Sequence, residues 1–72
     1  MKLFTTTLCS ACFTIKKLLP ENHNIEIINL QDNPEAIETY GILSVPTLVD
    51  DNGNKYTVPF EIIQRIKDEY AK

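Results

Sequence analysis

Two cysteines, Cys9 and Cys12, mark a change of hydrophobic pattern that restricts the fold more than any other feature of this chain. Before them, residues 2–6 (KLFTT) are short, partly apolar and rich in residue types that favour strands. After them, apolar residues recur at the spacing of one helix face: Ala11, Ile15, Leu18 and Leu19. The cysteine pair therefore stands where a predicted strand gives way to a helix predicted from about Ser10 to Leu19.

The chain continues to alternate strand and helix patterns. Residues 25–30 (IEIINL) are rich in β-branched residues and predict a second strand. A second helix follows, with Asp32 or Asn33 as its cap ahead of Pro34. Gly41 suits the C-terminal end of this helix.

The last third of the chain predicts a hairpin and a final helix. Residues 47–50 (TLVD) predict a third strand that the chain enters through Pro46. The dipeptide Asn52–Gly53 is a strong hairpin signal, so residues 55–58 (KYTV) should return antiparallel. A helix is predicted from Pro59 to about Tyr70, with one apolar stripe: Phe60, Ile63, Ile66 and Tyr70.

The predicted order of elements is βαβαββα, in a single α/β domain spanning residues 1–72. The first two strands should be parallel, because a helical crossover joins them, and the crossover should be right-handed. We therefore expect a mixed four-stranded sheet with helices on both faces.

Length and charge narrow the classes of function. A chain of 72 residues builds a thin core, so any chemistry should lie at a surface edge. Its net charge of −3 and lack of a basic stripe argue against nucleic-acid binding. No apolar run resembles a signal peptide or approaches the roughly 20 residues of a membrane span. We therefore expect a cytoplasmic monomer without membrane contact, in a compartment where thiols are kept reduced.

Three roles are open to the cysteine pair. A structural zinc site uses two such pairs, or one pair and two histidines, whereas this chain offers one pair and His23, so we expect no metal site. A disulfide that closes so short a loop stabilises a fold by about 2 kcal/mol at most, and a reducing compartment disfavours it. Redox chemistry fits best, because a CxxC motif near a βαβ pattern is typical of dithiol exchange.

The position of the pair also predicts how the two thiols divide the reaction. Cys9 should face the unpaired N–H groups and the positive end of the helix, which favour the thiolate. Cys12 lies one turn further along, nearer the apolar face, and should be buried. We expect Cys9 to attack a target disulfide and Cys12 to resolve the mixed disulfide.

The segments CSAC and YGILSVPTLV together closely resemble the thioredoxin superfamily in order and spacing. The resemblance covers essentially the whole chain and implies a thioredoxin-like fold with a redox-active Cys9–Cys12 disulfide and no bound cofactor. It also implies a cis Val45–Pro46 bond lying against the cysteines, with backbone groups before the proline offered to an extended substrate. The implied substrate-binding residues are Leu8, Ser10, Ala11, Ser44, Val45 and Pro46.

Within the superfamily the motifs leave three hypotheses. The first is a small thioredoxin-like reductant of protein disulfides, recycled by a flavin-dependent, NADPH-using thioredoxin reductase, with ribonucleotide reductase as one client. The second is a glutathione-dependent glutaredoxin, although Thr6 replaces the usual basic residue and TVPFE the usual Gly-Gly turn. Thioredoxins instead carry a buried acid where this chain has Leu3. The third is a non-enzymatic CxxC module that binds metal or senses redox state.

The remaining aromatic and acidic residues predict structural roles. Core or rim packing is expected for the tyrosines Tyr40, Tyr56 and Tyr70, and core packing for Phe60. The acids are expected to be solvated or to serve turns: Glu35, Glu38, Asp50 and Asp51.

Overall fold

The computed structural model describes residues 1–21 and 23–70, and it has the predicted order of elements. The strands are β1 (Lys2–Thr5), β2 (Glu26–Asn29), β3 (Thr47–Val49) and β4 (Lys55–Tyr56), and the helices are α1 (Ser10–Leu18), α2 (Glu35–Tyr40) and α3 (Pro59–Tyr70). Most ends lie within one or two residues of the prediction. The expected fourth strand is shorter than predicted: it comprises Lys55–Tyr56, the first half of KYTV.

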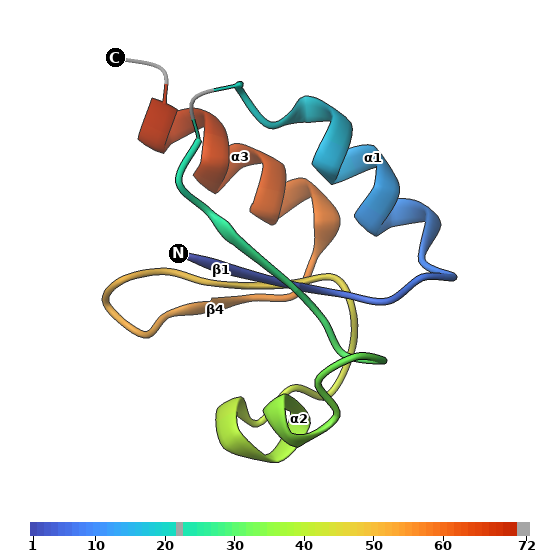
Figure 1. Cartoon of the computed structure of the whole chain (residues 1–72). Coiled ribbons are helices and arrows are strands. Elements are labelled where there is room, and N and C mark those ends of the chain that lie inside the picture. Colours follow the sequence, from blue (N-terminus) through green and yellow to red (C-terminus); the bar gives the residue numbers. More distant parts are fainter. Residues whose placement is uncertain (22, 71–72) are drawn as a thin grey trace.

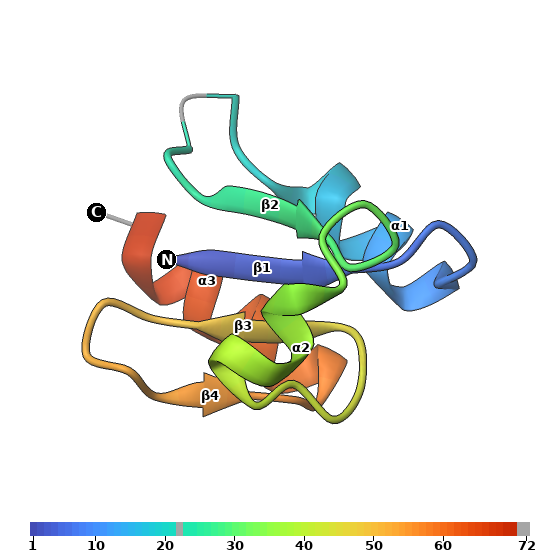
Figure 2. The same cartoon turned by 60° about the horizontal axis from the view of Figure 1, so that its bottom comes forward.

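The strands form one four-stranded sheet in the order β2-β1-β3-β4 (Figure 2). β1 and β2 are parallel, as expected for strands that a helical crossover joins. β3 is antiparallel to both β1 and β4, so β3 and β4 form the predicted hairpin. The mixed sheet confirms the expected fold class.

Helices cover both faces of the sheet, with α1 and α3 together on one face and α2 on the other (Figure 1). Each face carries its own apolar cluster. The cluster under α1 and α3, which we call the α1–α3 cluster, consists of Leu3, Ile15, Ile25, Leu48, Ile62 and Ile66. The smaller cluster under α2, the α2 cluster, consists of Phe4, Leu30, Ala36 and Ile42. Because β1 supplies a residue to each cluster, this strand is buried from both sides.

The cap predicted for the second helix is wrong, whereas its predicted end is confirmed. Pro34 occupies the cap position of α2, and within residues 1–21 and 23–70 no side chain forms a capping hydrogen bond there. The Asn33 amide instead donates to the carbonyl of Asn29, at 3.3 Å, which removes it from the cap. At the other end Gly41 adopts the left-handed conformation, with φ 64°.

The stripe predicted for the last helix is also partly wrong. Ile62 and Ile66 form the buried stripe of α3, whereas Phe60 is 75% exposed and Ile63 is only partly buried. Residues two apart point to nearly opposite sides of a helix, so placing Ile62 in the core turns Phe60 outward. The core position expected for Phe60 is therefore corrected to a surface position.

One acid departs from the solvated state expected of it. Asp50 is buried, and its carboxylate accepts hydrogen bonds from Asn52, Asn54 and Tyr56. It serves the β3–β4 turn, as predicted, but from inside the fold. Asp51, Glu35 and Glu38 are exposed, as expected.

The tyrosines pack as predicted. Tyr40 lies against Phe4, with ring centroids 5.1 Å apart, and Tyr56 and Tyr70 pack against the α1–α3 cluster. Across residues 1–21 and 23–70, none of the helices has the length and hydropathy that crossing a membrane requires.

Candidate redox site

The two cysteines form a disulfide at the start of α1, with Cα atoms 5.2 Å apart. Cys9 is the N-cap residue of the helix, in an extended conformation. Its Sγ accepts a hydrogen bond from the backbone N–H of Cys12 at 3.1 Å, in the way that a serine or aspartate oxygen caps a helix. The sulfur of Cys9 therefore sits at the positive end of α1, where a negative charge is stabilised.

The two sulfurs differ in their access to solvent. Cys12 is 1% exposed and lies on the same side of α1 as Ile15, which belongs to the α1–α3 cluster. Cys9 is only partly buried. An incoming disulfide can reach Cys9 first, and Cys12 only through it.

The sheet brings the Pro46 segment to the same end of the molecule as the cysteines. In the register of β1 against β3, Phe4 pairs with Thr47, so Pro46 lies beside the end of β1, from which the chain turns into Cys9. The Val45–Pro46 peptide bond is cis, as the family resemblance implies. Pro46 is buried, and Val45 is half-buried against the α2 cluster.

Backbone groups of this segment are available for pairing. The carbonyl of Ser44 accepts a hydrogen bond from the Thr47 hydroxyl at 2.6 Å, which holds the bend around Pro46. Within residues 1–21 and 23–70, the backbone N–H and C=O of Val45 make no backbone hydrogen bond. An extended chain laid along Val45 could use both groups.

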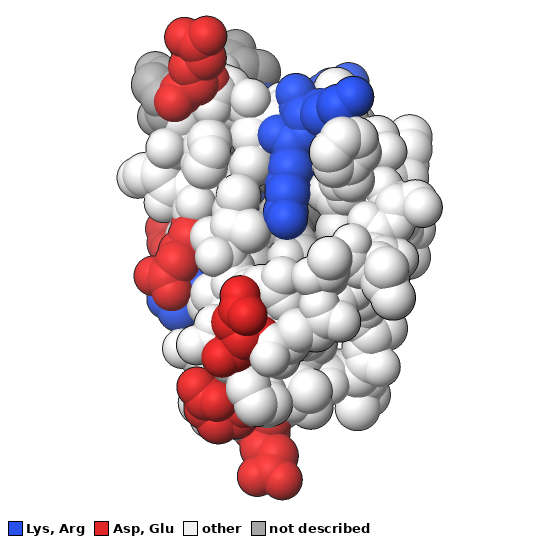
Figure 3. All heavy atoms as spheres, turned by 45° about the vertical axis from the view of Figure 1, so that its right-hand side comes forward, with Lys and Arg blue, Asp and Glu red and all other residues white. Residues whose placement is uncertain are grey.

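The predicted contact residues differ in exposure. Leu8 is 89% exposed, Ser10 and Ser44 are exposed, and Ala11 is half-buried. The face that includes the β1–α1 turn is largely uncharged, with basic groups toward one end and acidic groups along one side (Figure 3). The sequence neighbours of Cys9 and Pro46 are likewise uncharged: Leu8, Ser10, Ala11, Ser44 and Val45.

Sequence reasoning missed two exposed apolar residues near these segments. Leu43, just before Ser44, is 98% exposed, and Phe13, in the first turns of α1, is 60% exposed. The signal for Phe13 was present in the sequence: it lies off the face that Ala11 and Ile15 define. Lys17 Nζ lies 4.7 Å from the centroid of the Phe13 ring, over its face.

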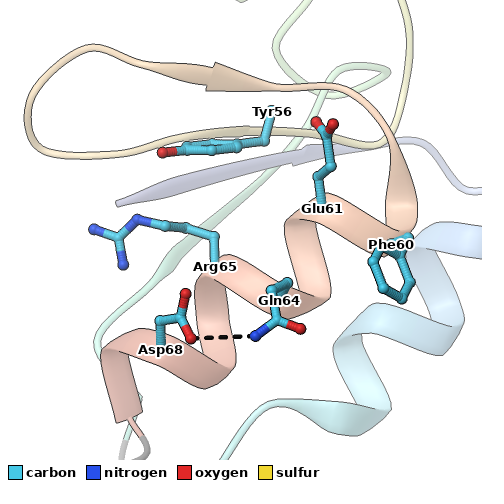
Figure 4. A pocket seen from close by; sticks show the side chains of 6 residues that line it. All are labelled: Tyr56, Phe60, Glu61, Gln64, Arg65 and Asp68. Carbon is cyan, nitrogen blue, oxygen red and sulfur yellow. Dashed lines mark hydrogen bonds between the residues drawn. The ribbon is translucent and has the colours of Figure 1, made fainter.

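Phe60 belongs to a separate groove of about 410 Å³ between β4 and α3, lined also by Tyr56, Glu61, Gln64, Arg65 and Asp68 (Figure 4). On the α3 side of the groove, the side-chain amide of Gln64 donates a hydrogen bond to the Asp68 carboxylate at 3.2 Å. Arg65 Nε lies 3.7 Å from the buried Asp50 carboxylate. Neither cysteine lines this groove, so it is not part of the redox site.

A ring of hydrogen bonds holds the turn before Cys9, and sequence reasoning did not anticipate it. The Thr7 N–H donates to the Gln31 side chain at 3.2 Å, and the Asn29 amide donates to the Thr7 hydroxyl, also at 3.2 Å. The backbone N–H of Gln31 donates to the side-chain oxygen of Asn29 at 2.8 Å, which closes the ring. The end of β2 therefore positions the turn that carries Cys9.

The positions of the potential ligand side chains do not support a metal site. Within the described part of the chain, no cluster of three or more histidine, cysteine or acidic residues could hold a metal ion. His23 instead accepts a hydrogen bond from the N–H of Ile25 through its Nδ1, at 3.1 Å.

Among curated proteins, the chain is similar to a thioredoxin of Methanocaldococcus jannaschii. The two sequences are 36% identical over 56 residues, which cover 68% of this chain and 66% of the relative, just under two thirds of its length. No protein-family model matches the chain, and no solved structure matches it significantly.

Proposed function

The chain belongs to the thioredoxin superfamily, and on that premise we propose that it is a thiol–disulfide oxidoreductase that reduces protein disulfides through Cys9 and Cys12. One observation carries the proposal: Cys9, a partly exposed residue, caps α1 through a sulfur that accepts the Cys12 N–H and is bonded to the buried Cys12. That geometry favours a thiolate at Cys9 and keeps its partner out of reach of the client.

The reaction needs no bound cofactor. The Cys9 thiolate attacks one sulfur of a client disulfide, which forms a mixed disulfide and releases the other client sulfur as a thiolate that takes up a proton. Cys12 then loses its proton and attacks Cys9, which forms the Cys9–Cys12 bond and releases the second client thiolate. The client gains the electron pair that the dithiol loses.

The client would bind as an extended segment across the uncharged residues beside Cys9 and Pro46. The residues proposed for this contact are Leu8, Ser10, Ala11, Ser44, Val45 and Pro46. Leu8 supplies apolar area, and the backbone of Val45 offers one donor and one acceptor for strand-like pairing.

We further propose that a flavin-dependent thioredoxin reductase regenerates the dithiol with electrons from NADPH, and that ribonucleotide reductase is among the clients. Recycling by glutathione, as in a glutaredoxin, is the competing function. A metal-binding or redox-sensing module is a third. Its metal-binding form lacks a cluster of three or more potential ligands within residues 1–21 and 23–70.

Single-cysteine variants test the assigned roles. Cys9→Ser should abolish reduction of a protein disulfide such as that of insulin, because no nucleophile remains within reach of the client. Cys12→Ser should instead accumulate a mixed disulfide with the client, visible by non-reducing electrophoresis and mass spectrometry. A Cys12→Ser protein that forms no mixed disulfide, while Cys9→Ser forms one, would reverse the roles.

A second experiment identifies the reducing partner. The oxidised protein is supplied with NADPH and either thioredoxin reductase or glutathione with glutathione reductase, and recovery of the two thiols is followed. We expect recovery with thioredoxin reductase. Recovery with glutathione alone would overturn this choice in favour of a glutaredoxin, and tight metal binding with negligible disulfide exchange would favour the third function.

A further inference from the structure

One buried hydroxyl has no role in the reaction described so far. Thr5 is 0% exposed, and among residues 1–21 and 23–70 its Oγ1 is the buried side-chain polar atom that lacks a hydrogen-bond partner. Buried polar side chains nearly always have a partner, because an unpaired one loses its hydrogen bonds to water without replacement. An unpaired hydroxyl at the end of β1, four residues before Cys9, therefore suggests a partner that exists in another redox state.

The Thr5 side chain lies on the sheet face that α1 covers. Side chains alternate along a strand, and in β1 Leu3 packs with Ile15 of α1, whereas Phe4 packs on the opposite face with Ala36. Thr5 comes two residues after Leu3 and shares its face. It is also the last residue of β1, at the end from which the chain turns toward Cys9.

Cys12 belongs to the first turn of α1, which follows this end of β1. It precedes Ile15 by about one helical turn and, like Ile15, is 1% exposed on the inner side of α1. α1 runs back over the sheet from the turn that follows β1, so its first turn lies near the end of the strand (Figure 1). Thr5 and Cys12 therefore lie on the same side of the sheet, toward the end of β1, and in the disulfide form the Thr5 hydroxyl makes no hydrogen bond to either sulfur within the described residues.

Among the described residues, no buried charged side chain lies with Thr5 and Cys12 between β1 and α1. The buried polar side chains are Thr5, Thr47 and Asp50. Thr47 donates to the carbonyl of Ser44, and Asp50 lies at the opposite end of β3, in the β3–β4 turn. The charged side chains of β1, α1 and α3 are exposed or only partly buried: Lys2, Lys16, Lys17, Glu61, Arg65, Lys67, Asp68 and Glu69.

We propose that Thr5 donates a hydrogen bond to the Cys12 sulfur once the disulfide is reduced, and thereby stabilises the Cys12 thiolate in the resolving step. The inference rests on the proposed function, because it concerns a thiolate that only that reaction forms. A hydrogen bond to a charged sulfur is stronger than one to a neutral group, so it lowers the pKa of the Cys12 thiol.

The hydrogen bond from Thr5 changes neither the bonds made and broken in the resolving step nor the protons transferred in it. The Cys12 thiol gives its proton to water, and its thiolate attacks the Cys9 sulfur of the mixed disulfide. The Cys9–Cys12 bond forms, the Cys9–client bond breaks, and the client thiolate takes a proton from water. Thr5 keeps its proton throughout, since an alcohol is too weak an acid to give it up.

Two substitutions at Thr5 separate the hydroxyl from the packing. Thr5→Val keeps the shape and removes the hydroxyl, whereas Thr5→Ser keeps the hydroxyl and removes a methyl group. The Val variant should be at least as stable as wild type when oxidised, because it removes an unpaired polar group, and the Ser variant should be less stable. Thr5→Ala gives a second hydroxyl-free variant if Val does not fold.

The reaction step is measured with 5,5′-dithiobis(2-nitrobenzoate) and the reduced protein. Cys9 releases a first thionitrobenzoate on forming the mixed disulfide, and Cys12 releases the second on resolving it, so stopped-flow absorbance separates the two steps. We expect Thr5→Val to slow the second release about threefold at neutral pH, because a rise of about one unit in the pKa of Cys12 lowers the thiolate fraction tenfold while the more basic thiolate attacks faster. Thr5→Ser should remain close to wild type, although it is the less stable protein.

A direct readout of the hydrogen bond is the titration of Cys12 in a Cys9→Ser background, followed by the ¹³Cβ shift of Cys12. The pKa should rise by about one unit when Thr5 becomes Val, and return with Ser. An unchanged pKa overturns the inference even if the second release slows, because packing alone would then explain the rate. A wild-type protein that never releases the second thionitrobenzoate contradicts the proposed function instead.

Discussion

At the scale of single residues, the Asp50 carboxylate organises the turn between β3 and β4. Burial raises its pKa, but this effect is outweighed by hydrogen bonds from the N–H and side chain of Asn54, the N–H of Asn52 and the Tyr56 hydroxyl. The net result is a pKa below the ordinary value of 3.8. The folded protein therefore holds a proton on Asp50 less readily than the unfolded chain does.

This shift predicts a loss of stability in acid. A lowered carboxyl pKa contributes stability that is fully present above the unfolded pKa of 3.8 and is lost as the pH falls through the folded pKa. Asp50→Asn should therefore lower the free energy of unfolding at neutral pH, and its difference from wild type should shrink below about pH 4. Urea denaturation of the two proteins at a series of pH values measures the free energy of unfolding of each and the difference between them.

Glu38→Gln serves as the matched control, since Glu38 is exposed and the substitution removes the same charge. It should change stability little at any pH. If Asp50→Asn and Glu38→Gln gave the same pH profile, net charge and not the Asp50 hydrogen bonds would account for the acid sensitivity.

At the scale of elements, Gly41 ends α2 and directs the chain toward the Pro46 segment. It has φ 64°, and its N–H donates to the carbonyl of Ile37. The Ile42 N–H donates to the same carbonyl, at 2.9 Å. These bonds close the helix and turn Ile42 into the α2 cluster.

Gly41→Ala should destabilise the protein by about 1–2 kcal/mol, because a Cβ disfavours the left-handed conformation. A Cβ at this position would lie 3.0 Å from Lys55 Nζ, and that flexible chain end can move aside. Gly41→Asn, whose side chain tolerates this conformation better, should lose less. Thermal unfolding ranks the two variants, and equal losses would place the cost in crowding and not in the backbone.

At the scale of the whole molecule, the fold depends on two small clusters separated by one sheet. α1 and α3 contact each other across the larger cluster, and Ile62 of α3, at 0% exposure, lies in its centre. A domain of this size has a total stability of about 4–11 kcal/mol, so the loss of a few buried methylene groups is a large fraction of it.

Ile62→Ala should lower the free energy of unfolding by about 2–5 kcal/mol. Ile63→Ala, at the next and only partly buried position of the same helix, should cost clearly less. Both are measured by urea denaturation of the oxidised protein. Similar losses at the two positions would show that Ile63, as the apolar stripe in the sequence predicted, belongs to the core.

The chemistry of the site was readable in advance because it depends on short-range features. Cys9 and Cys12 are close in sequence, and a helix that begins beside them needs only local periodicity to be recognised. The exposed Leu8 and the buried Cys12 follow from the same pattern. Phe60 was misplaced because a stripe one position away, through Ile62, satisfies the helical spacing about as well.

The sequence by itself determined the order of strands and helices, the hairpin at Asn52–Gly53 and the asymmetric cysteine pair, because spacing and turn chemistry act over a few residues. Only the tertiary structure decided which contacts join distant segments: the ring of Thr7, Asn29 and Gln31, and the buried sites of Asp50 and Thr5. These depend on strand register and on which face of each element is covered. Both are set by packing across the whole sheet, which no local pattern encodes.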